Sequence, residues 1–146
     1  MNVVDTTAPV FTSSAAFIVD ENQTAVGTVV ATDADGDTLT YSIAGASELQ
    51  ISSAGGVVSF ISAPDFETKS VFTAAVTATD GTASTTQRIV VTLTDVNEAP
   101  VFTSGANFTA AENQTAVGAV VATDVDGDTL TSVSYTHLTL PTKRIV

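Results

Sequence analysis

Residues 31–40 read Ala31-Thr32-Asp33-Ala34-Asp35-Gly36-Asp37-Thr38-Leu39-Thr40, and residues 122–131 repeat them with a single change, Val125 in place of Ala34. Two further segments return at the same offset of 91 residues, the distance from Asp33 to Asp124: residues 8–13 return at 99–104, and residues 21–27 return at 112–118. Repeats that stack into one common core have shorter periods, of about 20–50 residues. The sequence therefore predicts tandem domains, each repeat being a domain of its own.

The second copy ends at Ser132, because residues 133–146 share nothing with positions 42–55 of the first copy. We expect four segments: 1–7 as a linker from a preceding repeat, 8–98 as one complete domain, 99–132 as the truncated start of a second, and 133–146 as a non-native tail. The tail contains His137, the single histidine, and closely resembles translated sequencing-adapter DNA. The alternative is a divergent strand. On the first interpretation, His137 is not a ligand.

Alternation of apolar and polar residues indicates β-strands through the first repeat. Ile89, Val91 and Leu93, for example, alternate with Thr92 and Thr94. Turn residues separate seven segments of this kind, at 10–19, 24–32, 38–43, 48–52, 56–61, 71–79 and 84–95. No stretch has the pattern of an amphipathic helix, so we predict an all-β, seven-stranded antiparallel β-sandwich of the Greek-key type.

The acidic residues gather where these strands are expected to end. The chain has 16 Asp and Glu residues against 4 Lys and Arg residues, which gives a net charge of −12 at pH 7. If successive strands alternate in direction, the acids at 21, 65, 67 and 95–98 share one end of the sandwich, and those at 33–37 and 80 share the other. Carboxylates that converge without cations repel one another and raise one another's pKa. The pattern therefore favours bound metal ions.

Calcium suits these clusters better than other metals do. It takes six to eight oxygen ligands at about 2.3–2.6 Å, whereas magnesium prefers fewer protein ligands and keeps more water. Zinc is disfavoured because the chain has no Cys and its one His lies in the tail. An EF-hand at Asp33 fails, because Gly36 is misplaced and the twelfth position is Ala44 where that loop needs Glu.

Five acidic motifs follow one another in the order of the calcium motifs of one known family. They are the turn at Glu21, the loop Asp33-Ala34-Asp35, Pro64-Asp65-Phe66-Glu67, Ala78-Thr79-Asp80-Gly81 and the linker Asp95-Val96-Asn97-Glu98-Ala99-Pro100. On these motifs residues 8–132 resemble the cadherin repeat, in the form common in large bacterial surface proteins. The resemblance implies a cadherin- or immunoglobulin-like sandwich with Ca²⁺ bound between consecutive repeats.

The resemblance also implies which residues hold the ions. At the exit of the first repeat it implies Glu21, Asp65, Glu67, Asp95, Asn97, Glu98, Asp124 and Asp126, while Asp33, Asp35 and Asp80 would face a preceding repeat. Glu98 and Ala99 depart from the Asp and Asn usual in animal cadherins, and the second repeat ends before a counterpart of Asp80. The chain has no Trp, so the strand exchange of classical animal cadherins is not implied.

Composition excludes several other functions. So acidic a chain lacks the basic patches that nucleic-acid binding requires, and no run approaches the roughly 20 apolar residues of a membrane span. Nucleophilic catalysis lacks a Cys and a usable His. A carboxylate pair of the glycosidase type would lack an aromatic sugar platform, since Trp is absent and only two Tyr are present. We therefore expect no enzymatic activity.

The expected function is calcium binding at the junctions between repeats, which rigidifies a tandem array in cell adhesion. Its partners would be the adjacent repeats, together with a protein or carbohydrate on another cell. The alternative is a passive spacer in a large secreted or surface protein. Both imply an extracellular or cell-surface location, although the first residues lack the features of a signal peptide.

Overall fold

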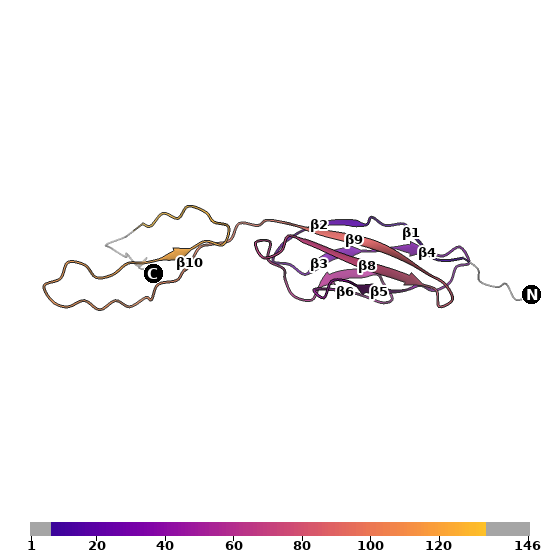
Figure 1. The fold of residues 1–146 in the computed structure, drawn as a ribbon, viewed down its shortest axis with the longest axis horizontal. Coiled ribbons are helices and arrows are strands. Elements are labelled where there is room, and N and C mark those ends of the chain that lie inside the picture. Colours follow the sequence, from indigo (N-terminus) through magenta and orange to yellow (C-terminus); the bar gives the residue numbers. More distant parts are fainter. Residues whose placement is uncertain (1–6, 134–146) are drawn as a thin grey trace, which may run out of the picture. The chain divides into compact units, whose positions relative to one another are not determined.

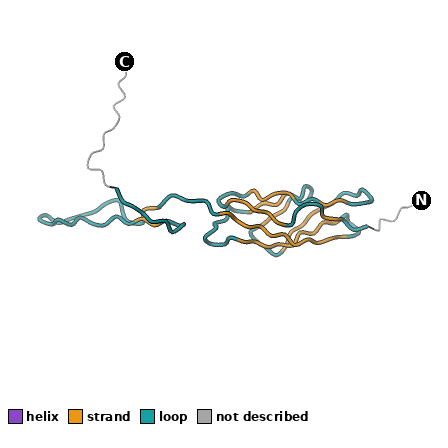
Figure 2. Tube along the Cα trace, turned by 90° about the horizontal axis from the view of Figure 1, so that it is seen from above, coloured by secondary structure: helices purple, strands orange, loops and turns teal. Residues whose placement is uncertain are grey.

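The computed structural model describes residues 7–133, so residues 1–6 of the expected linker and most of the expected tail, including His137, lie outside the described residues. The chain divides into two compact units, Met1–Val96 and Asn97–Val146. All regular elements in the described range are β-strands (Figures 1 and 2). No helix there is long and apolar enough to cross a membrane.

The first unit is a β-sandwich whose larger sheet has the order β2-β9-β8-β5. Its strands are β2 (Ala16–Asp20), β5 (Thr40–Ala44), β8 (Val71–Thr79) and β9 (Ser84–Thr94). The smaller sheet, with the order β3-β7-β6, contains β3 (Ala25–Thr28), β6 (Leu49–Ile51) and β7 (Val57–Phe60). A further antiparallel pair joins β1 (Val10–Phe11) to β4 (Ala31–Thr32). The predicted all-β sandwich is confirmed.

Two expected segments are each divided between two strands. Segment 10–19 becomes β1 and β2, because β1 pairs with β4 whereas β2 pairs with β9. Segment 24–32 becomes β3 and β4 in the same way, with a register shift between Ala25 and Gly27. The pairing of β2 with β9 is parallel, with Ala16 opposite Val90 and Asp20 opposite Thr94. The sandwich is therefore not purely antiparallel, since its first long strand and its last run in the same direction.

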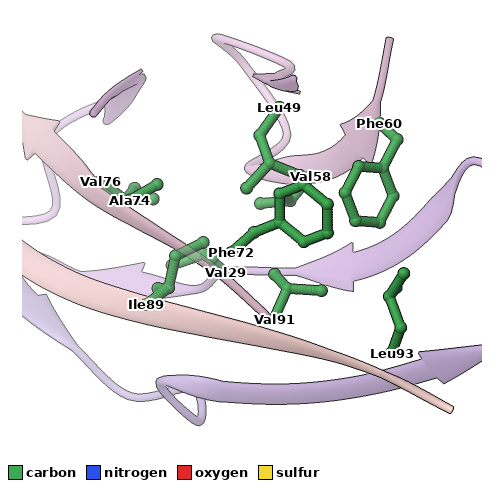
Figure 3. Packing of buried hydrophobic residues seen from close by; sticks show 10 residues of the cluster. All are labelled: Val29, Leu49, Val58, Phe60, Phe72, Ala74, Val76, Ile89, Val91 and Leu93. Atoms are coloured by element: carbon green, nitrogen blue, oxygen red, sulfur yellow. The ribbon is translucent and has the colours of Figure 1, made fainter. Parts of the chain in front are cut away.

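The core lies between the two sheets and uses the alternating apolar positions. On β9, Ile89 and Val91 are fully buried and Leu93 is nearly so. Figure 3 shows these side chains with the other core residues, among them Phe60 and Phe72, whose rings meet edge to face at 4.9 Å. Such aromatic pairs add about 0.5–1.5 kcal/mol beyond the area that they bury. The packed core fixes the strand ends from which the acidic loops project.

The turn before β7 requires glycine at one position. Gly56 has a φ of +63°, and a Cβ added there would lie 2.1 Å from the carbonyl oxygen of Val29. The same two residues are joined by a hydrogen bond from the Val29 amide to the Gly56 carbonyl, at 2.9 Å. The close approach of these backbones explains why no side chain fits.

The second unit repeats the opening of the first. β10 (Val101–Phe102) pairs with β11 (Ala122–Thr123) in the register of β1 with β4. Its interior positions, however, are open: Val120 is 60% exposed, whereas Val29, its counterpart, is fully buried. The described part of this unit therefore has no closed core.

Candidate metal centre

Glu21 is the one buried charged residue among the described residues, with 3% of its surface exposed. It follows β2 directly, and its backbone amide donates to the carbonyl of Thr94 at 3.2 Å. Its two carboxylate oxygens accept bonds from different segments: Oε2 from the amide of Phe66 at 2.8 Å, and Oε1 from the amide of Val96 at 2.9 Å. Together these bonds tie the turn after β2 to the loop that contains Phe66 and to the exit of β9.

The loop between β7 and β8 supplies two more acids. Asp65 accepts bonds at Oδ1 from the Thr68 amide, at 3.0 Å, and at Oδ2 from the Thr68 hydroxyl, at 3.1 Å. These two bonds lower the pKa of Asp65, and the bond from the amide has the larger effect. The carboxylate is therefore charged at neutral pH. Glu67 follows two residues later and is exposed. The carboxylates of Asp65 and Glu67 thus lie on a turn that the hydrogen bonds between Thr68 and Asp65 close.

One carboxylate oxygen from each of Glu21, Asp65 and Glu67 lies within 4.8 Å of the other two. We call these three residues the acidic triad. Lys69 is the nearest cation in sequence, but its Nζ binds Glu48 at 2.6 Å and lies over the ring of Phe72. That salt bridge lowers the pKa of Glu48. The triad is therefore a set of converging oxygens beside a lysine engaged elsewhere, which is the donor set that a hard divalent cation prefers.

The acids at the other end of the first unit are arranged differently. Asp33 Oδ1 accepts from the Asp35 amide at 2.8 Å, and Asp80 Oδ1 accepts from the amides of Thr82 and Ala83 at 2.6 and 2.7 Å. The Oδ2 atoms of Asp33 and Asp80 are buried and accept no hydrogen bond in the described structure. Asp33, Asp35 and Asp80 do not form a three-acid group like the triad within the described residues.

The remaining predicted ligands follow β9 or belong to the second unit. Asp95 follows β9 in the first unit. In the second unit, Asn97 Nδ2 donates to the carbonyl of Glu98 at 3.1 Å, and the Glu98 amide donates to Asp126 Oδ2 at 2.7 Å. Asp124 Oδ1 accepts from the amide of Asp128 at 3.2 Å. Asp126 is thus held against Glu98, and Asp124 closes its own loop.

Sequence reasoning named every member of the acidic triad, but it missed the amide donors that position Glu21. Phe66 and Val96 act through their backbone N–H groups, which any residue other than proline carries. No side-chain signal marks them. The positive φ of Asn22, 62°, which recurs at Asn113 as 63°, is the local trace of this turn. Asn tolerates that conformation better than most residues do, so the dipeptide Glu-Asn is a sequence signal for this turn.

Known proteins resemble the chain in fold and sequence. It is 35% identical over 102 residues to chitinase A from Pseudoalteromonas piscicida, a match that covers 68% of this chain and 12% of that protein. Human protocadherin-24 EC1-2 superposes with a TM-score of 0.60 at 27% identity, covering 81% of this chain and 60% of that one. Mouse cadherin-23 EC22-24 gives a TM-score of 0.54 at 28% identity, covering 81% and 44%.

The chain spans only part of each of these relatives. Their fold nevertheless agrees with the expected resemblance to cadherin repeats. A family profile described as "Bacterial Ig domain" matches residues 6–92, which include the strands β1 to β8 and most of β9, as far as Thr92. That match covers more than half of the chain. The protein therefore belongs to the bacterial Ig domain family, with a sandwich like that of cadherin repeats.

Proposed function

We propose that this chain is a calcium-binding module of a tandem-repeat protein outside the cell, and that the ions stiffen the array. The observation that carries the proposal is the acidic triad, whose carboxylates converge within 4.8 Å at the end of the sandwich. Converging anions destabilise a fold unless a cation offsets their repulsion. Ca²⁺ would add further oxygen ligands and water to the three carboxylates.

The hydrogen bonds of Glu21 explain how the ion would act mechanically. Glu21 joins the turn after β2 to Phe66 and to Val96, the residue at which the first unit ends. An ion bound to Glu21, Asp65 and Glu67 would hold the turn and the loop together, and would fix the carboxylate to which the Val96 amide donates. The exit of the chain from the sandwich would then lose freedom, which is how calcium would stiffen the connection to the next repeat.

The wider ligand set rests on the sequence resemblance. In this proposal Asp95, Asn97, Glu98, Asp124 and Asp126 complete the sites at the exit of the repeat. Asp33, Asp35 and Asp80 serve the ion sites toward a preceding repeat. The orphaned Oδ2 atoms of Asp33 and Asp80 support the second assignment, because a buried carboxylate oxygen without a partner costs about 1–3 kcal/mol or more.

A calcium titration of the whole chain tests the proposal. Extracellular modules bind calcium at about 10⁻⁴–10⁻³ M, and a ligand at 100 times its Kd adds about 2.7 kcal/mol to the free energy of unfolding. We expect a rise in Tm of roughly 10 °C or more, since each kcal/mol shifts Tm by about 4–8 °C in a domain of this size.

The matched variants are Glu67→Gln, in the triad, and Glu48→Gln, which removes an exposed Glu paired with Lys69. Glu67→Gln should reduce the calcium-induced rise in Tm, and Glu48→Gln should leave it unchanged. No change in Tm on adding calcium at tens of millimolar would refute the proposal.

A passive spacer is the second candidate. The match to chitinase A favours it, because a segment like this chain makes up only 12% of that protein. A spacer would need no metal and no adhesive contact. The two candidates differ in the titration, since a passive spacer would have the same Tm and the same hydrodynamic radius with and without calcium.

A further inference from the structure

The outer face of the larger sheet differs from the rest of this acidic chain. It consists of the residues that alternate with the buried ones along β2, β9, β8 and β5, strands that lie side by side in Figure 1. These residues are Thr, Ser, Ala, Val and Ile, apart from two that are charged: Arg88 on β9 and Asp20 at the end of β2. In a protein with a net charge of −12, this face is almost free of acids.

The central part of the face is apolar. Ile18 is 75% exposed and Val71 is 48% exposed. Both lie opposite Thr92 on β9, one from each neighbouring strand. In the next outward row, Val90 lies between Ala16 and Thr73. Two adjacent rows of aliphatic and threonine side chains thus cross three strands. Ala16, Ile18 and Val71 in them are exposed, and Thr73, Val90 and Thr92 are half-buried.

The two charges lie on opposite sides of this apolar centre. Arg88 is exposed, donates only to the Thr73 hydroxyl, at 3.4 Å, and forms no salt bridge with a described residue. Asp20 lies beside Thr94, whose hydroxyl donates to it. Residues 88 and 94 are six apart on one strand, so the charged positions are separated by roughly 20 Å. The apolar rows at 90 and 92 lie between them.

We propose that this face binds the same face of a second copy of the chain, with the two sets of strands antiparallel. The two-fold axis would lie between the two sheets, perpendicular to the strands and midway between the rows of Val90 and Thr92. It would place the Val90 row of each copy over the Thr92 row of the other. The same axis brings Arg88 of each copy over the row that contains Asp20 in the other. The interface is isologous, with an apolar centre and two reciprocal ion pairs.

The charge pattern selects this orientation over the alternative two-fold arrangement. An axis along the strands would place each row over itself and would bring Arg88 close to its own counterpart, which is unfavourable. Packed sheets keep their strands within about 30° of each other and lie about 10 Å apart, a gap that an Arg side chain can span. The antiparallel pair is therefore the arrangement in which both charges find partners.

The pair should be weak and reversible in a single chain. The apolar centre covers three strands about 4.8 Å apart and two rows about 7 Å apart, an area on the order of 200 Å². A standard interface buries roughly 800 Å² per partner. In a long array, several such faces would act together and raise the avidity. The association is side by side and does not require calcium, so it is independent of the proposed metal site.

Sedimentation equilibrium of the whole chain, over about 10 μM to 1 mM, tests the proposal. We expect a monomer–dimer equilibrium in calcium and in chelator alike. The variants Arg88→Asp and Asp20→Lys should each raise the dimer Kd at least about tenfold, since each places like charges opposite one another. Mixing the two variants should restore dimerisation, because both ion pairs of the heterodimer are then favourable. Failure of the mixture to dimerise would overturn the proposal.

A second pair of variants separates this face from other sticky surfaces. Ile18→Glu puts a charge in the apolar centre, whereas Ile61→Glu changes a residue 62% exposed that follows β7 in the other sheet. Dimerisation should be lost in the first variant and kept in the second. Equal association in both variants would assign it to another surface, such as the open apolar residues of the second unit, and would also overturn the proposal.

Discussion

At the scale of single residues, the most informative side chain is Glu21. Its carboxylate is buried, yet both oxygens accept backbone hydrogen bonds from segments far apart in sequence. A buried charge without such donors would be expensive. Glu21 thus has a structural role that does not depend on any ion, and it is also the most enclosed member of the acidic triad.

Replacing Glu21 by Gln separates these two roles. Gln keeps the shape of Glu but has an NH₂ group in place of one of the two acceptor oxygens. An NH₂ group cannot accept a hydrogen bond, so one of the two backbone amides loses its partner. We expect a loss of about 1–3 kcal/mol in the free energy of unfolding in chelator, measured by urea denaturation. Glu67→Gln is the control: it removes an exposed triad carboxylate and should change stability in chelator by no more than about 0.5 kcal/mol. Equal losses in both variants would contradict the structural role.

Asp65 supports a prediction about pH. Its pKa is lowered in the folded state by the amide and hydroxyl of Thr68. A depressed folded pKa contributes stability that is fully present above the ordinary value of about 3.9, and that stability is lost as the pH falls through the lower folded pKa. The acid limb of the stability curve should therefore be shallower in Asp65→Asn than in the parent chain. Urea midpoints measured from pH 5 downward check this, and parallel curves would show that Asp65 has no such effect.

At the scale of strands and turns, the sequence predicts what is local. The long strands β8 and β9 are found where alternation places them, because each contributes one full face to the core. The division of segment 10–19 could not be predicted, since β2 is set by its pairing with β9, which lies far along the chain. The site follows the same rule. Asp65 and Glu67 lie in one readable motif, whereas the burial of Glu21 depends on packing around it.

The turn before β7 provides a test with a matched control in the adjacent residue. Gly56→Ala would place a Cβ against the Val29 carbonyl and would hold alanine at a positive φ. A left-handed conformation alone costs about 1–2 kcal/mol, so we expect a loss of about 2 kcal/mol or more in the free energy of unfolding. Gly55→Ala meets only ordinary contacts, at 3.6 and 3.8 Å, and its expected effect is small. Thermal unfolding of both variants measures the difference, and similar losses would contradict the assigned strain.

At the scale of the whole molecule, charge and core are segregated. The packed core belongs to the first unit, the acids cluster at its strand ends, and the outer face of its larger sheet is nearly uncharged. Each region is thus free to serve a different purpose: the core maintains the fold, the acidic ends bind cations in our proposal, and the outer face meets a second copy. Changes in the second unit should accordingly affect metal binding without affecting the fold of the first.

Asp124→Ala tests this independence. Asp124 lies in the second unit, where it accepts one hydrogen bond from within its own loop, and the hydrophobic core contains no residue of that unit. The thermal unfolding of the first sandwich in chelator should therefore be unchanged. If Asp124 is a calcium ligand, the loss of one carboxylate from a site of this kind should weaken calcium binding, measured by isothermal titration calorimetry. Val125→Ala, a change at the exposed neighbouring residue, is the control and should leave both quantities unchanged. Unchanged calcium affinity in Asp124→Ala would remove this residue from the ligand set, and a lower Tm in chelator would show that the first sandwich depends on the second unit.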